Sequence, residues 1–400
     1  MTDRLYYDQT YLTSFEATVL EVRPEREKQL VLLDRSAFYP TSGGQPFDTG
    51  TLRTGERVLS VTEVSVDREG NVWHSISGEL APGDRVTGEI DWERRFDHMQ
   101  QHGGEHMLAG AVWERLRGVT QGLHLGVEDS SIDVALPDGS ARVDAETVRE
   151  LEELVNRRIQ HNDPIRCWFP SEEELAALPL RKAPTVSEHV RIVAMGDYEM
   201  VACGGTHPAR TGEIGQIHIL SVTPVRGKAR FTFVCGMRAA RLYRRCTEIT
   251  DRLSAALSAP LLELPGAVDK LKGQLADLKA ELKKKEAEDW QKELESNLKP
   301  VTETAGGPLL AVCRREDGDP DAMTDAVTRM IRRPGLILLA GAGKRILLAR
   351  SEDIALDLCQ VIRQVAKGGG RPELATGAGG EKELQAAAEM IRSRCAQTER

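Results

Sequence analysis

Short apolar runs separated by turn residues fill roughly the first ninety residues of the chain. The clearest runs lie at residues 17–22, 30–33, 58–64, 72–74 and 85–90. Glycine, proline and aspartate stand between them, as they do at turns that join short strands. Many short strands in succession are typical of a small barrel or sandwich. We therefore expect residues 1–92 to form a β-barrel subdomain.

The pattern changes to a helical period near residue 94. Across residues 94–117, apolar and histidine positions recur at helical spacing, at Met99, His102, His106, Leu108 and Val112. A second helix is expected over residues 144–161, with strands near 190–194, 217–222 and 230–234. This mixture of helices and strands indicates a central α/β sandwich domain over residues 93–250.

Beyond the prolines at 260 and 265, one amphipathic helix is expected. Apolar residues alternate spacings of three and four among lysines and glutamates, at Val268, Leu271, Leu275, Leu278 and Leu282. This is a heptad pattern, but it lasts only about two heptads before it meets charged residues at 285 and 289. We expect residues 251–300 to form a helical arm that packs on a partner or on another domain, rather than a long coiled coil.

The last hundred residues alternate strand and helix. Strands are expected at 309–313, 336–340 and 345–349, and helices at 321–332 and 354–366. They indicate a small α/β domain over residues 301–400, so that the whole chain is a multidomain α+β and α/β protein. A glycine-rich stretch, residues 367–380, is expected to be a loop.

Composition narrows the class of protein. The chain has 400 residues, of which 40% are hydrophobic and 29% charged, and no apolar run approaches the roughly 20 residues of a membrane span. Its start is polar and unlike a signal peptide, which favours a cytoplasmic protein. Seven scattered cysteines are typical of reduced thiols rather than of a disulfide framework. The net charge of −9 argues against indiscriminate nucleic-acid binding, although local basic clusters such as residues 226–230 leave either RNA contact or plain solvated surface open.

Two separate patterns supply candidate metal ligands. His102 and His106 stand at i and i+4, where one helical face presents both imidazoles, but His98 satisfies the same spacing and the periodicity cannot choose between the pairs. About a hundred residues later comes Cys203-Gly-Gly-Thr-His207, whose glycines let a thiolate and an imidazole converge. One cysteine with histidines suits Zn²⁺. Gly103 stands where a zinc peptidase has glutamate, which weakens that class.

Longer motifs carry a resemblance to a known family. They are His102-Gly-Gly-Glu-His106, Cys203-Gly-Gly-Thr-His207 and the stretch Phe38-Tyr-Pro-Thr-Ser-Gly-Gly-Gln-Pro-Phe-Asp-Thr-Gly50. Together they resemble the editing domain of alanyl-tRNA synthetase and its free-standing relatives, the AlaX proteins. The last hundred residues look like the DHHA1 domain of those synthetases. Over nearly its whole length the chain is similar to the long AlaX type.

The resemblance implies an activity and a set of site residues. In the family, Ser-tRNA(Ala), and often Gly-tRNA(Ala), is deacylated by ester hydrolysis, and one Zn²⁺ per chain is held by residues equivalent to His102, His106, Cys203 and His207. The attacking group is unassigned, and a zinc-associated water is the hypothesis. Thr41 is the residue expected to hydrogen-bond the serine hydroxyl. Gly43, Gly44 and Gln45 are expected to contact substrate too, although their stretch is also typical of a barrel turn.

Further partners are expected, and other functions stay open. Basic side chains among exposed amides favour RNA contact by the residues Lys367, Gly368, Gly369, Gly370 and Arg371, with a purely structural role as the alternative. A homodimer is expected through the helical arm or the C-terminal domain, and no membrane partner. The alternatives to an editing hydrolase are a zinc peptidase or amidohydrolase, and a noncatalytic, zinc-stabilised tRNA-binding dimer. Glu105 either tunes the site or faces solvent.

Overall fold

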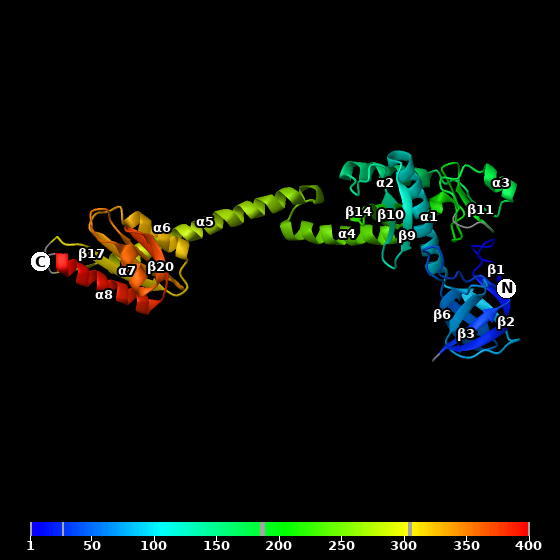
Figure 1. Cartoon of the computed structure of the whole chain (residues 1–400), viewed down its shortest axis with the longest axis horizontal. Helices are drawn as coiled ribbons and strands as arrows, with labels where there is room; N and C mark the ends of the chain where they lie inside the picture. Colours follow the sequence, from blue (N-terminus) through cyan, green and yellow to red (C-terminus); the bar gives the residue numbers. More distant parts are fainter. Residues whose placement is uncertain (1, 26–27, 185–188, 303–305, 399–400) are drawn as a thin grey trace. The chain divides into compact units, whose positions relative to one another are not determined.

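The structure is a computed structural model that describes residues 2–25, 28–184, 189–302 and 306–398. Contacts between residues divide the chain into two units, unit 1 (Met1–Thr250) and unit 2 (Asp251–Arg400), drawn in Figure 1. The parts expected at 1–92 and 93–250 thus share one unit, and those expected at 251–300 and 301–400 share the other.

A closed six-stranded barrel begins unit 1, which confirms the expected barrel. Its strand order is β2-β3-β7-β6-β5-β8, and its strands are β2 (Ser14–Glu25), β3 (Lys28–Leu33), β5 (Gly50–Thr54), β6 (Arg57–Val66), β7 (Val72–Ile76) and β8 (Arg85–Ile90). Every second residue of β8 is buried, as expected when one face of a strand lines a barrel interior. Two further short strands, β1 (Asp3–Arg4) and β4 (Arg35–Ser36), pair in parallel beside it.

Helix α1 (Trp92–Leu116) leads from the barrel into the core of unit 1. It begins where the Asp91 side chain accepts a hydrogen bond from Arg94 N, and it ends where Arg117 adopts the left-handed conformation (φ 54°). All residues from His98 to Val112 are buried. A helix buried on every side lies inside the core, so its polar residues need partners within the protein.

The remainder of unit 1 contains two small sheets. The four-stranded sheet has the order β14-β15-β10-β9, formed by β9 (Val119–Leu125), β10 (Ser130–Ala135), β14 (Ile217–Val225) and β15 (Lys228–Cys235). Helices α1 and α2 (Ala145–Gln160) share an apolar core with its inner face, as an α/β sandwich requires. The three-stranded sheet contains β11 (Ile165–Trp168), β12 (Ile192–Met195) and β13 (Glu199–Ala202). The short elements α3 (Glu172–Ala177) and η1 (Thr211–Ile214) complete unit 1, and helix α4 (Gly236–Leu257) runs across the division.

Unit 2 contains a six-stranded sheet with helices on both faces (Figure 1). Its order is β16-β17-β18-β19-β21-β20, formed by β16 (Lys299–Pro300), β17 (Leu309–Arg315), β18 (Leu336–Ala342), β19 (Arg345–Arg350), β20 (Lys367–Arg371) and β21 (Leu374–Ala378). One core packs α6 (Pro320–Met330) on the sheet, and the other packs α7 (Leu358–Val365) and α8 (Glu381–Thr398). All seven residues of β18 are buried, because this central strand is covered on both faces.

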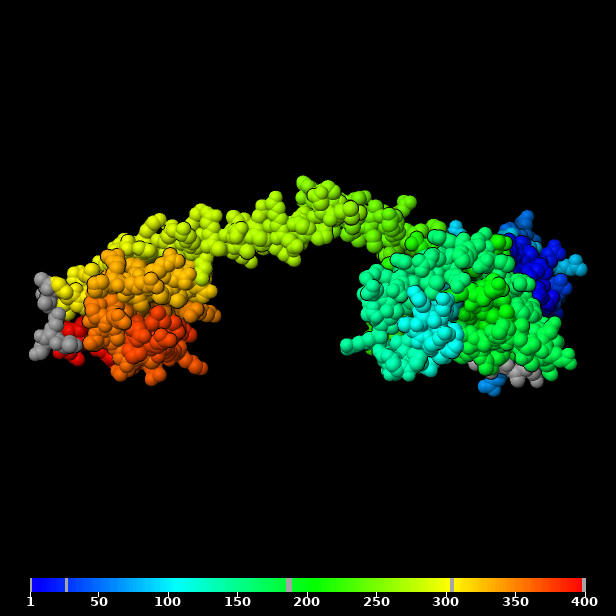
Figure 2. Space-filling view, turned by 90° about the horizontal axis from the view of Figure 1, so that it is seen from above, coloured from blue at the N-terminus to red at the C-terminus, as the bar shows by residue number. Residues whose placement is uncertain are grey.

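The expected helical arm is longer than its heptad pattern and joins the core of unit 2. After η2 (Leu261–Glu263), α5 runs from Leu264 to Ser296, and its last turns bury Ala287, Trp290 and Leu294 against the sheet and α6. The heptad residues Val268 to Leu282 stay exposed. In Figure 2 this yellow-green stretch of α5 stands clear of the orange and red layers of unit 2. None of the described helices is long and apolar enough to cross a membrane.

The stretch expected as a glycine-rich loop is instead a β-hairpin formed by β20 and β21. β20 pairs with β21 over its whole length, from Lys367↔Ala378 to Arg371↔Leu374. A Cβ on Gly368 would lie 2.3 Å from Thr376 O, so glycine is required by the close approach of the two strands. The loop expectation was wrong because a strand built from glycines offers no alternation of side chains to read.

Candidate metal centre

The middle of α1 carries two predicted ligands on one face. The rings of His102 and His106 stack with 5.0 Å between their centroids and 16° between their planes. The glycines between them let the helix pack tightly, because a Cβ on Gly104 would lie 2.1 Å from the sulfur of Cys235 in β15. The sequence between the two histidines therefore fixes how closely the ligand helix approaches the sheet.

The other two predicted ligands, Cys203 and His207, follow β13 in a tight turn. A Cβ on Gly205 would lie 2.1 Å from His102 Cε1, so only glycine leaves room for that imidazole. Gly205 N also donates a hydrogen bond to Cys203 Sγ at 3.4 Å. The glycines of this turn thus bring it directly against the ring of His102.

The four predicted ligands converge on one point. His106 Nε2 lies 3.1 Å from His207 Nε2, and Cys203 Sγ lies 3.3 Å from His102 Nε2 and 3.6 Å from His207 Nε2. All four ligand atoms lie within 4.8 Å of one another. The three histidines are at most 5% exposed. The structure therefore brings together the four residues that were selected by resemblance.

Burial sets the protonation states of this cluster. It lowers the pKa of His102 to about 3 and holds the pKa of both His106 and His207 well below the ordinary value, with a further lowering from the neighbouring histidines. Neutral imidazoles keep a lone pair for a metal ion. Burial also raises the pKa of the Cys203 thiol to about 12. A cation is therefore needed in the cluster if this sulfur is to be a thiolate near neutral pH.

The donor set fits a tetrahedral metal ion. Ligand bonds of about 2.0 Å to nitrogen and 2.3 Å to sulfur give donor separations of roughly 3.3–3.6 Å in a tetrahedron. The separations of 3.1, 3.3 and 3.6 Å lie close to these values, and all four ligand atoms lie within 4.8 Å of one another. Without an ion, His106 Nε2 and His207 Nε2 can pair only through a proton carried by one of them. A bound cation satisfies both.

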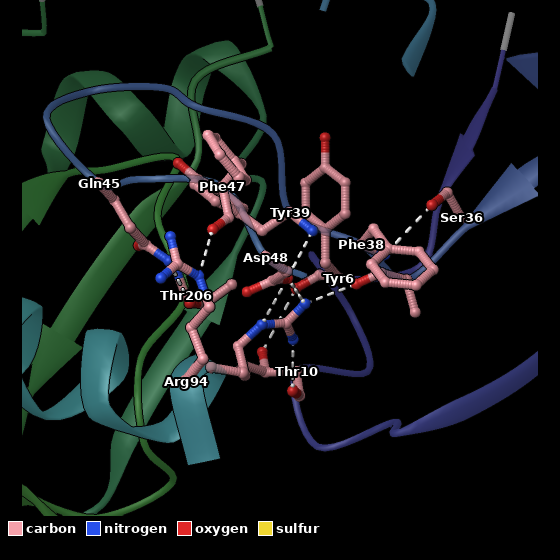
Figure 3. Close-up of polar contacts among 12 residues, drawn as sticks. Tyr6, Thr10, Ser36, Phe38, Tyr39, Gln45, Phe47, Asp48, Arg94 and Thr206 are labelled. Atoms are coloured by element: carbon pink, nitrogen blue, oxygen red, sulfur yellow. Dashed lines mark hydrogen bonds and ion pairs between the residues drawn. The ribbon is translucent and has the colours of Figure 1, made fainter. Parts of the chain in front are cut away.

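Gln45 supports the cluster from behind. Its Oε1 lies 2.9 Å from His102 Nδ1 and accepts a hydrogen bond from Thr206 N at 3.0 Å, while its Nε2 donates to Thr206 Oγ1 at 2.7 Å. With Oε1 as acceptor, the proton of His102 is on Nδ1, and Nε2 points its lone pair at the other ligands. Figure 3 shows Gln45 reaching Thr206. Gln45 is fully buried and does not line the cavity described below.

The predicted binding residues Thr41, Gly43 and Gly44 differ in position, and Ser42, which was not predicted, lies between them. Ser42 and Gly43 line the cavity, whereas Thr41 and Gly44 are not among its lining residues. The Thr41 side chain is exposed, and its N–H donates to Val64 O at 3.2 Å. A Cβ on Gly44 (φ +89°) would lie 2.7 Å from Leu123 O, so this glycine permits the segment to pack on β9.

A buried ion pair joins the segment between β4 and β5 to helix α1. The Arg95 guanidinium and the Asp48 carboxylate are both fully buried and joined by two hydrogen bonds, one of which is 2.9 Å from Nε to Oδ2. Asp48 Oδ2 also accepts from Tyr39 N at 2.6 Å, as Figure 3 shows. Arg95 Nη1 donates to Thr10 O at 2.9 Å. The barrel segment, the N-terminal stretch and the ligand helix are thereby held as one assembly.

The cluster lies in the wall of a cavity of about 630 Å³. His102, His106 and Cys203 line it, together with the cationic residues Arg4, Arg181, Lys182 and Arg191 and the aromatic residues Tyr7, Tyr39 and Phe169. Such a volume accommodates a ligand of small-molecule size. The single carboxylate in the lining is Glu105, so cationic residues outnumber acidic ones among the described residues of this cavity.

Three further residues near the sequence motifs, Glu105, His98 and His124, lie outside the ligand cluster. Glu105 is 5% exposed and lies against the cavity, so the alternative in which it faces solvent was wrong. Burial raises the pKa of its carboxyl to about 8. His98 is buried outside the cluster, and burial lowers its pKa to about 4. His124 lies in β9, also outside the cluster.

Arg191 is a residue of the site that sequence reasoning missed. It is 4% exposed, and its guanidinium donates to three backbone carbonyls, those of Cys203 (3.2 Å), Gly205 (2.8 Å) and Tyr7 (3.1 Å). It thereby shapes the ligand turn and places a positive charge beside the Cys203 sulfur. Its position just before an apolar strand was visible in the sequence, but nothing there shows which carbonyls it reaches.

Two sequence families match parts of unit 1. Residues 2–94 match the family described as tRNA synthetases class II (A), and residues 190–230 match the threonyl and alanyl tRNA synthetase second additional domain. The second match contains Cys203 and His207. A solved structure of RecJ from Thermus thermophilus aligns with 14% identity and a TM-score of 0.27, over 37% of this chain and 28% of that chain, and so low a likeness carries no argument.

Curated relatives match over most of this chain. An alanine–tRNA ligase of Halobacterium salinarum is 33% identical over 86% of this chain, and one of Pyrococcus furiosus is 32% identical over 94%. This chain spans only 37% and 42% of those two proteins. The alanyl-tRNA editing protein AlaX-L of Pyrococcus horikoshii is 29% identical, with 98% of this chain and 99% of that protein aligned. Over most of its length this chain is therefore similar both to alanine–tRNA ligases and to an alanyl-tRNA editing protein.

Proposed function

We propose that this chain is an editing hydrolase that removes serine, and also glycine, from mischarged tRNA(Ala). The observation that carries the proposal is the convergence of three histidine nitrogens and one cysteine sulfur beside a cavity whose lining contains four cationic residues. A related protein that aligns with 98% of this chain is named an alanyl-tRNA editing protein, which supports the same activity. Ester hydrolysis at such a centre needs no ATP.

We propose Zn²⁺ as the metal, one ion per chain. One cysteine and three histidines form a borderline-soft donor set, which suits zinc better than magnesium, calcium or manganese. A bound zinc ion supplies a Lewis acid that polarises an ester carbonyl or a water molecule. The chain's own contribution is to keep His102 Nε2 directed inward through Gln45, and to hold the Cys203 turn in place through Arg191.

Recognition of the serine hydroxyl is assigned to the 41–45 segment. A pocket that hydrogen-bonds this hydroxyl discriminates against alanine, because alanine leaves the buried polar group unpaired. The family resemblance points to Thr41, and the cavity lining points to its neighbour Ser42. Thr41→Val and Ser42→Ala, compared for hydrolysis of Ser-tRNA(Ala) against Ala-tRNA(Ala), decide which hydroxyl is used. If neither variant changes the preference, the assignment to this segment is wrong.

The test of the function is a deacylation assay with three substrates, Ser-, Gly- and Ala-tRNA(Ala). We expect the wild type to release serine and glycine faster than alanine, and Cys203→Ala to lose activity and bound zinc together. The control is Cys359→Ala, which truncates a buried cysteine of unit 2 outside the ligand cluster. Full activity of metal-free protein contradicts the zinc assignment. Peptide cleavage, or tRNA binding without turnover, indicates one of the two alternative functions.

Unit 2 is proposed to contact the tRNA through β20. Lys367 and Arg371 are exposed at the two ends of this strand, where they suit contacts to phosphate groups. Lys367→Ala combined with Arg371→Ala is expected to raise KM for Ser-tRNA(Ala) and to leave zinc content unchanged. Arg392→Ala removes an exposed cation of α8 as a control. An unchanged KM in the double variant rules out this contact.

A homodimer is proposed through α5. Its apolar stripe is 38–63% exposed from Val268 to Leu282, and such a stripe favours pairing with another helix. Leu275→Glu is expected to convert a dimer into a monomer in sedimentation experiments, whereas Asp277→Lys on another face of the helix is not. A monomeric wild type contradicts the proposal.

A further inference from the structure

An exposed aromatic ring lies in the wall of the cavity that holds the ligand cluster. Phe169 follows strand β11 directly and is 44% exposed. Its ring contacts Tyr7 edge to face, with 5.6 Å between centroids and 77° between planes. Both residues line the cavity. A large apolar ring left open in the lining of this cavity is available for a flat ligand.

The second ring of this pair is already fixed by its surroundings. The Arg191 guanidinium lies 5.3 Å from the centroid of the Tyr7 ring, and that of Arg4 lies 6.0 Å from it. Tyr7 O also accepts a hydrogen bond from Arg191 Nη2 at 3.1 Å. Tyr7 is therefore a rigid support, and Phe169 is the ring of the pair that offers exposed surface.

Two cations that line the same cavity have no carboxylate partner among the described residues. Arg4 Nη2 donates to Gly70 O at 2.7 Å, and Lys182 Nζ donates to Thr120 O at 3.2 Å. Within the part of the chain that the structure describes, no ion pair joins either of them to an acidic side chain. Aromatic rings next to unpaired cations form the surface on which single-stranded nucleic acids bind.

We propose that Phe169, supported by Tyr7, stacks on the terminal base of the RNA whose aminoacyl ester reaches the ligand cluster, while Arg4 and Lys182 contact its phosphates. This inference rests on the proposed function. The base and the ester are attached to the same ribose, so an ester held at the cluster places the base within the same cavity. Phe169 acts as a positioning residue, because it orients the nucleotide and does not touch the reacting bond.

The test separates base stacking from hydrolysis. Phe169→Leu keeps an apolar side chain without a ring, Phe169→Trp keeps a ring, and Tyr243→Leu removes an exposed ring of α4 outside the cavity. Each is measured for kcat and KM on Ser-tRNA(Ala), for hydrolysis of serine methyl ester, which has no base, and for zinc content. Calorimetry with a non-hydrolysable 3′-serylamido adenosine gives a binding constant that does not depend on turnover.

We expect Phe169→Leu to raise KM and the Kd of the analogue roughly tenfold, the size of one base-aromatic stack, with kcat, zinc content and methyl ester hydrolysis unchanged. Phe169→Trp should retain wild-type binding. The inference is overturned if Phe169→Leu binds the analogue as the wild type does, or if Tyr243→Leu weakens binding equally. A wild type that binds the analogue through Phe169 but leaves Ser-tRNA(Ala) intact contradicts the proposed function and not the stacking.

Discussion

Gln45 Oε1 lies 2.9 Å from His102 Nδ1, and through this contact the barrel segment supports a residue of the ligand cluster. The same amide holds Thr206 in the turn between Cys203 and His207. A residue expected to touch substrate thus lies behind the cluster, where it links the two sequence motifs that supply the ligands. The order of the metal centre therefore depends on the barrel as well as on α1.

Gln45→Ala is expected to weaken zinc binding by roughly 10-fold to 100-fold, the usual effect of losing a group that orients a histidine ligand. The affinity is measured by competition with a chromophoric chelator. The matched control is Gln29→Ala in the barrel, because both amide atoms of Gln29 bond the backbone of Leu80 and neither approaches the ligands. Equal zinc affinity in the Gln45 variant and the wild type would show that the contact does not orient His102.

Asp48→Asn is expected to destabilise unit 1 by about 3–5 kcal/mol, because it leaves the buried Arg95 guanidinium without its counter-charge. Urea unfolding measures the change. Glu153→Gln breaks an exposed i,i+4 pair with Arg157, whose side chains are 70% and 63% exposed, and should change stability by less than about 0.5 kcal/mol. A loss of similar size in both variants would contradict a special role for the buried pair.

Gly104→Ala is expected to destabilise unit 1 by about 1–3 kcal/mol, because the added Cβ would meet the Cys235 sulfur. Combining it with Cys235→Ala removes that sulfur and should recover part of the loss. Gly273→Ala in α5 places its Cβ in open space, so it should stabilise the helix by up to about 1 kcal/mol. Thermal unfolding of the wild type and the three variants shows whether each change raises or lowers the Tm. If the double variant recovers no stability, a contact other than the Cys235 sulfur causes the loss in Gly104→Ala.

The ligand set shows what a sequence can and cannot predict. The i,i+4 pair and the CGGTH turn are local, so the spacing alone indicated a metal site. The choice of His102 and His106 over His98 is not local, because all three repeat along one helical face. Only the docking of the turn after β13, which requires Gly205 against the His102 ring, selects the pair. The family resemblance identified His102 and His106 correctly, but the spacing of the histidines alone could not.

Many elements with an alternating or helical period were predicted, although the helices α4 and α8 were not. The barrel strands β2, β3, β6, β7 and β8 and the helices α1 and α2 follow such patterns, and the structure contains all of them. β20 was missed because its glycines carry no side-chain pattern. The last turns of α5 lie within the expected arm, and Trp290 and Leu294 in them pack on the sheet and α6 of the same unit. Arg191 and Phe169 act through contacts that lie far away in the sequence.

His74 makes the stability of the barrel depend on pH. It is fully buried, its Nδ1 lies 3.1 Å from Val31 O and its Nε2 lies 2.7 Å from Ser36 Oγ. Because a carbonyl only accepts, the neutral ring carries its proton on Nδ1 and accepts from Ser36 at Nε2. Burial lowers the pKa of His74 to about 4, against about 6.5 when the chain is unfolded. Between these values the unfolded chain binds more protons, so stability falls as the pH falls.

His74→Gln is therefore expected to flatten this dependence. Between about pH 7.5 and about pH 5 the wild type should lose about 2 kcal/mol of its free energy of unfolding through His74, a loss that the variant lacks. Urea unfolding of both proteins at the two pH values measures the difference, and contributions of the other histidines cancel in the comparison. The variant is expected to be less stable than the wild type at the higher pH, since the two hydrogen bonds change, and to close that gap at the lower pH. A gap that stays constant with pH would mean that His74 takes up its proton equally well in the folded barrel.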